Sequence, residues 1–126
     1  MLNVKQLLAK ILSTPHIIEQ GTDNDWTYRK WSDGLYEAWR FFQASGLNCT
    51  SASAGTWYGG QKTIALPSFA LTADNRTYGN SPSQSTGIYI YSTSVTNGQL
   101  EIDYRTHTSM SGAVCGGNFH IIGTWK

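Results

Sequence analysis

The chain has 126 residues, of which 40% are hydrophobic and 13% charged, and its net charge is +1. This length fits one domain, because two separate cores would each be too small to be stable. The small net charge gives no electrostatic basis for binding nucleic acid or an anionic membrane, and no apolar run approaches the roughly 20 residues of a membrane span.

The first 14 residues are predicted to form a helix, which Pro15 ends. Their apolar side chains alternate at steps of three and four residues, at Met1, Val4, Leu8 and Ile11. This is the spacing of a coiled-coil seam. Because so short a helix is marginal alone in water, it needs a partner. That partner is either other copies of the same helix or the chain's own following domain, and the sequence leaves both readings open. Lys5 and Lys10 interrupt the apolar stretch, so we read it as mature protein rather than a signal peptide.

Residues 15–126 are predicted to form one all-β domain. Alternating apolar and polar residues indicate strands at 16–20, 26–31, 35–44, 61–66, 87–92, 100–104 and 118–125. Turn residues lie at 21–25, 32–34, 73–76 and 97–98, and the segments 45–60 and 106–117 read as loops rich in small polar residues. Short strands at regular spacing favour an antiparallel β-sandwich or jelly-roll-like fold. The strand at 35–44 carries aromatic residues on both faces, which indicates cover on both sides, by its own core and by a neighbouring subunit.

No group of residues predicts catalysis, a metal site or a bound cofactor. The histidines His16, His107 and His120 form no short-range ligand pair. Glu37 and Glu101 lie in predicted strands and would make a glycosidase-like pair only if they converged. We expect a protein without enzymatic activity.

The two cysteines, Cys49 and Cys115, are expected to be free thiols, because nothing marks the chain as secreted by a host pathway.

Four aromatic residues are candidates for binding a ligand. Trp57 and Tyr58 lie in a loop-like segment, and Tyr89 and Tyr91 share one face of a strand. Such rings can stack on a sugar or rest on a surface polymer. The competing reading is that they belong to the core or to a subunit interface, as most aromatics in small β-domains do.

Two stretches at the ends of the chain resemble a known group of proteins. Residues 17–22 (IIEQGT) and 26–34 (WTYRKWSDG) at the start, and 119–126 (FHIIGTWK) at the end, are similar to the C-terminal domains of tail-fibre or baseplate proteins from phages and prophages of Gram-positive bacteria. The resemblance implies a homotrimer with its N-terminal helices bundled on the axis through Val4, Leu8 and Ile11. It implies a virion protein, made in the bacterial cytoplasm, that joins other tail or virion proteins and touches bacterial surface glycan.

Other functions remain open at this point. A head fibre or decoration protein would share the helix but would have no receptor role. A monomeric carbohydrate-binding module would have no use for an apolar helix seam, and a glycan-degrading enzyme would need converging carboxylates.

Overall fold

The computed structural model describes residues 3–79 and 84–126. Within these residues the chain forms one helix followed by nine strands. Their bounds are α1 Val4–Ser13, β1 Ile17–Asp23, β2 Trp26–Trp31, β3 Leu35–Cys49, β4 Ser51–Ser53, β5 Thr56–Ala65, β6 Asp74–Gly79, β7 Ile88–Thr96, β8 Gln99–Thr106 and β9 Met110–Thr124. The predicted all-β class with one short N-terminal helix is therefore confirmed.

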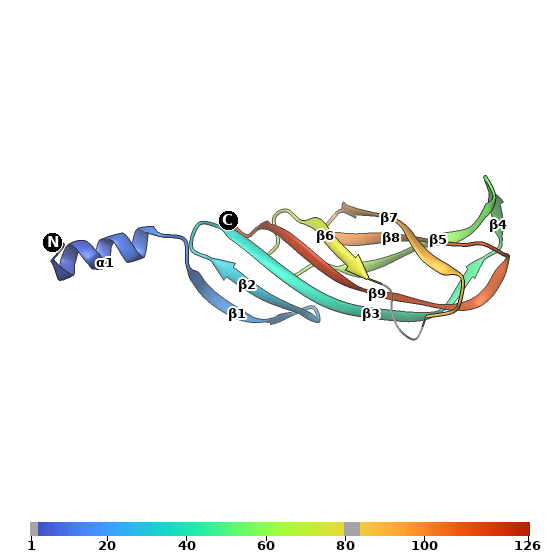
Figure 1. Ribbon diagram of the computed structural model, residues 1–126, viewed down its shortest axis with the longest axis horizontal. Helices are drawn as coiled ribbons and strands as arrows, with labels where there is room; N and C mark the ends of the chain where they lie inside the picture. Colours follow the sequence, from blue (N-terminus) through green and yellow to red (C-terminus); the bar gives the residue numbers. More distant parts are fainter. Residues whose placement is uncertain (1–2, 80–83) are drawn as a thin grey trace.

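The strands form two antiparallel sheets that enclose one core. Sheet A has the order β1-β2-β3-β9-β6, and sheet B has the order β4-β5-β8-β7. The molecule is elongated, and α1 extends from one end of it along its long axis (Figure 1). The β4–β5 hairpin lies at the opposite end (Figure 1). This arrangement gives the protein two distinct ends and two broad outer faces.

The core lies between the inward faces of the two sheets. Sheet A contributes Trp26, Tyr36 and Ile121, and sheet B contributes Leu100 and Ile102, all fully buried. The alternation predicted for the strand at 100–104 is confirmed, since β8 alternates buried and half-buried residues along its length. The indole N–H of Trp26 in β2 donates to the Ala65 carbonyl of β5 at 2.8 Å, which ties sheet A to sheet B.

Two close backbone approaches require glycine. A Cβ on Gly59 in β5 would lie 1.3 Å from the Asn48 carbonyl oxygen of β3, where the two sheets converge. A Cβ on Gly123 in β9 would lie 1.9 Å from the Thr72 carbonyl oxygen. Neither distance is possible without a backbone shift, so any side chain at these positions would push neighbouring strands or loops apart.

Turn chemistry explains several strand boundaries. The predicted Asn97-Gly98 turn is confirmed, with both residues at positive φ between the paired Thr96 and Gln99. The turn expected at 21–25 is shorter in the structure, because β1 continues to Asp23 and only Asn24 and Asp25 have positive φ. Asparagine and aspartate tolerate this conformation better than other residues with a Cβ, so a two-residue hairpin is possible here.

Three segments predicted as loops or turns are strands. Segment 45–60 contains the end of β3, all of β4 and the start of β5; the turn predicted at 73–76 opens β6; and segment 106–117 contains the start of β9. Segments 45–60 and 106–117 consist largely of Gly, Ser, Thr and Ala, whose small side chains leave no clear alternation, whereas Asp74 and Asn75 in segment 73–76 are typical turn residues. The conformation of these segments is set instead by backbone hydrogen bonds to neighbouring strands: β3 and β6 pair with β9, β4 pairs with β5, and β5 pairs with β8. The hairpin between β4 and β5 turns through Ala54 and Gly55, and an alanine at positive φ is a weak sequence signal.

The helix exposes its apolar side chains to solvent. Asn3 and Gln6 cap its start reciprocally: the Gln6 N–H donates to Asn3 Oδ1 at 2.9 Å, and the Asn3 N–H donates to Gln6 Oε1 at 3.1 Å. Val4 is 83% exposed and Leu8 is 54% exposed. The side chain of Ile11, the third predicted seam residue, lies outside the described part of the chain, as does all of Met1. No described helix has the length and apolar character needed to cross a membrane.

Candidate binding site

Sheet B gathers three of the four predicted ligand-binding aromatics on its outer face. Tyr58 of β5 and Tyr89 of β7 both pair with Arg105 of β8, from its two sides. Tyr91 lies at a register shift in β7 between Ile90 and Ser92 and is 57% exposed. Residues more than 30 positions apart in sequence therefore meet because β8 runs between β5 and β7.

Arg105 lies between two of these rings. Its Cζ is 4.2 Å from the ring centroid of Tyr91 and 4.9 Å from that of Tyr58. Its guanidinium also pairs with Asp103, with Nη2 3.3 Å from Oδ2, and both side chains are only 17% exposed. Nη1 donates to Thr56 Oγ1 at 3.3 Å. These three residues are here called the tyrosine–arginine platform (Tyr58, Tyr91 and Arg105), in which the cation contacts both rings.

Tyr89 extends this face toward His107. The two rings are stacked, with centroids 5.0 Å apart and planes 28° apart. Tyr89 is half-buried and His107 is exposed. The outer face of sheet B thus offers several aromatic rings with polar edges, which suits the apolar face and hydroxyl rim of a sugar ring.

Trp57 lies on the other side of the sheet. It pairs with Thr106, which is fully buried, and it packs against the core. The sequence placed it beside Tyr58 in a loop, but strand alternation sends the two neighbours to opposite faces. Trp57 therefore acts as a core residue in this structure rather than as part of the platform.

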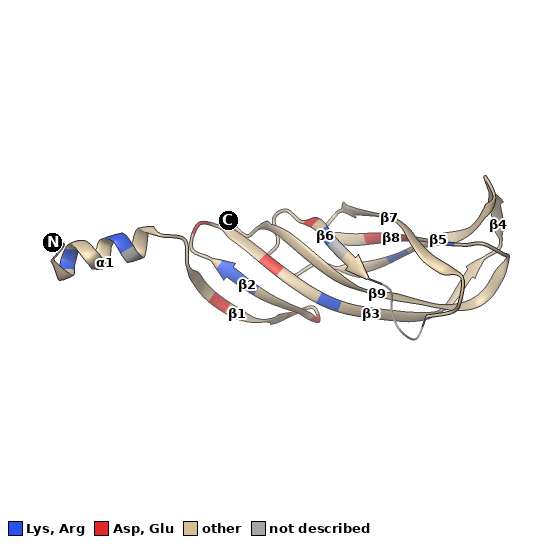
Figure 2. Cartoon of the chain, viewed as in Figure 1, with Lys and Arg blue, Asp and Glu red and all other residues tan. Residues whose placement is uncertain are grey.

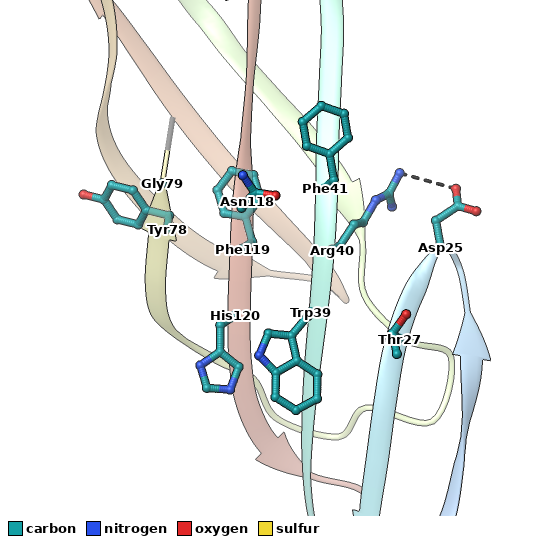
Figure 3. A pocket seen from close by; sticks show the side chains of 10 residues that line it. All are labelled: Asp25, Thr27, Trp39, Arg40, Phe41, Tyr78, Gly79, Asn118, Phe119 and His120. Carbon is teal, nitrogen blue, oxygen red and sulfur yellow. Dashed lines mark hydrogen bonds and ion pairs between the residues drawn. The ribbon is translucent and has the colours of Figure 1, made fainter. Parts of the chain in front are cut away.

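A second aromatic face lies on the outside of sheet A, where Trp39 of β3 and His120 of β9 are paired neighbours. Their rings are stacked 5.0 Å apart with planes 6° apart (Figure 3). Glu37 accepts from His120 at 3.2 Å and lies 3.9 Å from Arg29. An open hollow of about 540 Å³ runs along this face beside Phe41 (Figure 3).

The two strand carboxylates that might have formed a catalytic pair lie on different sheets. Glu37 is on the outer face of sheet A, bonded to His120 and Arg29. Glu101 is on the outer face of sheet B, where its Oε2 accepts from the Ser94 hydroxyl at 3.3 Å. The core separates them, so within one chain they do not face a common cleft. Among the described residues no group of three or more His, Cys, Asp or Glu is placed to hold a metal ion.

Cys49 and Cys115 are free and fully buried, as expected for unpaired thiols. Burial raises the pKa of both thiols, which disfavours the reactive thiolate. They fill space in the core.

Charged residues are few and scattered over the body of the molecule, with both signs interspersed (Figure 2). Comparison with protein-family models, with curated proteins and with solved structures finds no match.

Sequence reasoning missed Arg105, the residue that joins the predicted tyrosines. A signal was available, since Asp103 and Arg105 alternate with Ile102 and Tyr104 and so must face outward. What the sequence did not show is which strands flank β8. Without that strand order, the sequence does not predict that Tyr58 and Tyr91 lie beside the same arginine.

Proposed function

We propose that this protein is a structural component of a phage or prophage virion, a tail-fibre or baseplate module that attaches to the host cell surface. In this proposal it is a homotrimer of jelly-roll-like sandwiches. Its partners are its own copies, other tail or virion proteins, and bacterial surface glycan. It is made in the bacterial cytoplasm, neither binds nucleic acid nor inserts into a membrane, and carries no catalytic or metal site.

The observation that carries the proposal is the exposed apolar helix at one end of the molecule. Val4, Leu7, Leu8 and Leu12 are between 49% and 83% exposed. A ten-residue helix with such exposure is not stable in water by itself. Burying Val4 and Leu8 against copies of the same helix would stabilise it by roughly 1.5–3 kcal/mol per side chain. The seam spacing of Val4, Leu8 and Ile11 supports a bundle of parallel helices.

The opposite end offers the means of attachment. Tyr58 lies two residues after the start of β5, next to the β4–β5 hairpin that forms the end farthest from the helix (Figure 1). A trimer would present three tyrosine–arginine platforms away from the helical stem. Repeated weak sites on one particle bind a surface polymer far more tightly than a single site does.

The alternatives make less use of these features. A monomeric carbohydrate-binding module would leave the apolar helix without a partner. A head fibre or decoration protein would use the helix but not the platform.

Binding of the labelled protein to a panel of Gram-positive cells tests the proposal. Leu8→Asp should reduce cell binding at least tenfold, because it removes avidity, whereas Ala9→Asp, outside the seam, should not. Tyr91→Ala should keep the oligomer and weaken binding. A trimer that binds no cell type would favour the head-fibre or decoration role, and undiminished binding by Tyr91→Ala would exclude the platform as the attachment site.

A further inference from the structure

The outer face of sheet A carries a run of apolar side chains that the described part of the chain leaves half-buried or exposed. It consists of Leu35, Trp39 and Phe41 on β3 and Ile122 on β9, here called the apolar strip. Leu35 is 45% exposed and Phe41 is 52% exposed. Trp39 and Ile122 are half-buried. On sheet B, by contrast, the outward positions away from the tyrosines are hydroxyl, amide or charged residues, such as Gln61, Thr63, Ser92 and Ser94.

The strip is shaped to receive protruding side chains. The hollow of about 540 Å³ opens beside Phe41, at one end of the strip. A second hollow of about 320 Å³ lies at the other end, lined by Pro15, Trp31, Leu35 and Ile122 among others. Pro15 lies two residues after the end of α1, so the strip runs from the side of the domain that joins the helix toward its middle. Projecting rings beside open hollows on one face are what a complementary copy can interlock with.

The charges on this face are already matched among themselves. Glu37 lies between His120, at 3.2 Å, and Arg29, at 3.9 Å. Covering the face would therefore bury the Glu37 anion together with the Arg29 cation and the His120 ring that it already contacts, rather than leave a charge unpaired, which is the costly case. The strip can therefore be desolvated against a partner surface that carries no charge.

The surface area of the chain also points to a missing partner. The chain exposes 7381 Å². A compact monomer of 13.9 kDa is expected to expose about 6,700 Å², so the excess is about 700 Å². That is close to the roughly 800 Å² per partner that a standard stable interface buries. Part of the surface that a partner could cover lies on the helix, where Val4 is 83% exposed, and on the strip, where Phe41 is 52% exposed.

We infer that the apolar strip of one chain packs against a second copy of the same chain, so that the β-domains as well as the helices hold the assembly together. This inference rests on the proposed homotrimer and identifies the surface it uses. Because the helix extends along the long axis of the molecule, parallel helices at the usual separation of about 8–10 Å place the β-domains side by side. One broad face of each domain must then meet a neighbour, and sheet A presents the apolar one.

Photo-crosslinking of the full chain tests this packing. Phe41 is replaced by p-benzoylphenylalanine, which keeps an aromatic side chain at that position. The matched control carries the same group at Tyr91, an equally exposed ring on the outer face of sheet B. Irradiation of the Phe41 variant should yield covalent oligomers of the chain, and irradiation of the Tyr91 variant should yield none above background.

The outcomes separate this inference from the proposed function. A trimeric mass with no crosslinking from position 41, or equal crosslinking from both positions, would overturn the inference and leave the trimer standing. A monomeric mass for the unmodified chain would overturn both. As a second measure, Phe41→Lys should raise the dissociation constant of the oligomer at least tenfold while the far-ultraviolet circular dichroism spectrum stays unchanged. Thr63→Lys, at an exposed position on the outer face of sheet B opposite Glu101, should change that constant less than twofold, and equal weakening by the two variants would contradict the assignment.

Discussion

Replacing Arg105 by alanine should destabilise the fold measurably, because three interactions converge on its guanidinium. The Cζ atom lies 4.2 Å and 4.9 Å from the ring centroids of Tyr91 and Tyr58. Each such cation–π contact contributes about 0.5–1 kcal/mol at an exposed site and more where water is excluded. The third interaction is the ion pair with Asp103, whose side chain is only 17% exposed.

The loss of the ion pair adds to the loss of the aromatic contacts. Without Arg105, the largely covered Asp103 carboxylate loses the cation that it pairs with, which costs about 1 kcal/mol or more. Together these terms predict that Arg105→Ala lowers the free energy of unfolding by about 2–3 kcal/mol. The free energy of unfolding of Arg105→Lys should lie between those of the unmodified protein and Arg105→Ala, because lysine keeps the charge but not the planar group that stacks on the rings.

Urea unfolding at one fixed protein concentration provides the assay. The matched control is Arg76→Ala, since Arg76 pairs with Asp74 at 3.4 Å but the two side chains are 55% and 66% exposed. That exposed pair should contribute less than about 0.5 kcal/mol. If the two alanine variants lose equal stability, the guanidinium does not hold the platform together and the reasoning is refuted.

Three further predictions concern the core. Gly123→Ala should lower the free energy of unfolding, measured in urea, by about 3 kcal/mol or more, because its Cβ would lie 1.9 Å from the Thr72 carbonyl oxygen. Gly46→Ala, with no atom within 4 Å but φ of +78°, should lower it by about 1 kcal/mol, and equal losses would contradict the packing. Burial raises the pKa of Tyr36 to about 12, so its contribution to stability is complete below pH 10 and is lost as the pH rises toward 12. Burial also raises the pKa of Tyr104, so chemical unfolding across that range should show a decline in both proteins that is smaller by about 1–2 kcal/mol in Tyr36→Phe, and an identical decline in both would refute this origin. A thiol reagent such as dithionitrobenzoate should label neither cysteine in the native protein and both after unfolding, and rapid native labelling would contradict the burial of Cys49 and Cys115.

The parts of the fold that the sequence predicts are those where side chains alternate clearly. The strand at 100–104 and the Asn97-Gly98 turn follow from alternation and from the positive φ that Asn and Gly accept. The segments that fail are built from small residues, as in β4 and the start of β9, where pairing with neighbouring strands decides the conformation. Local sequence carries little information on that pairing.

In the candidate site, too, the sequence predicts which side chains face outward but not which strands lie side by side. The outward tyrosines of β7 can be found from alternation alone, but their assembly around Arg105 depends on β8 lying between β5 and β7. Trp57 was misplaced because its segment was read as a loop, which has no fixed faces. The Trp39–His120 stack likewise joins two strands whose pairing spans about 80 residues of sequence, and no local pattern encodes it.

The central claim is that the exposed helix seam and the apolar strip are covered by copies of the same chain. Absolute molar mass by light scattering on a size-exclusion column, measured for the unmodified chain, for Leu8→Asp and for Ala9→Asp, tests it most directly. The account predicts a mass about three times 13.9 kDa for the unmodified chain and for Ala9→Asp, and a shift toward monomer on dilution of Leu8→Asp. A monomeric mass for the unmodified chain at every concentration would contradict it.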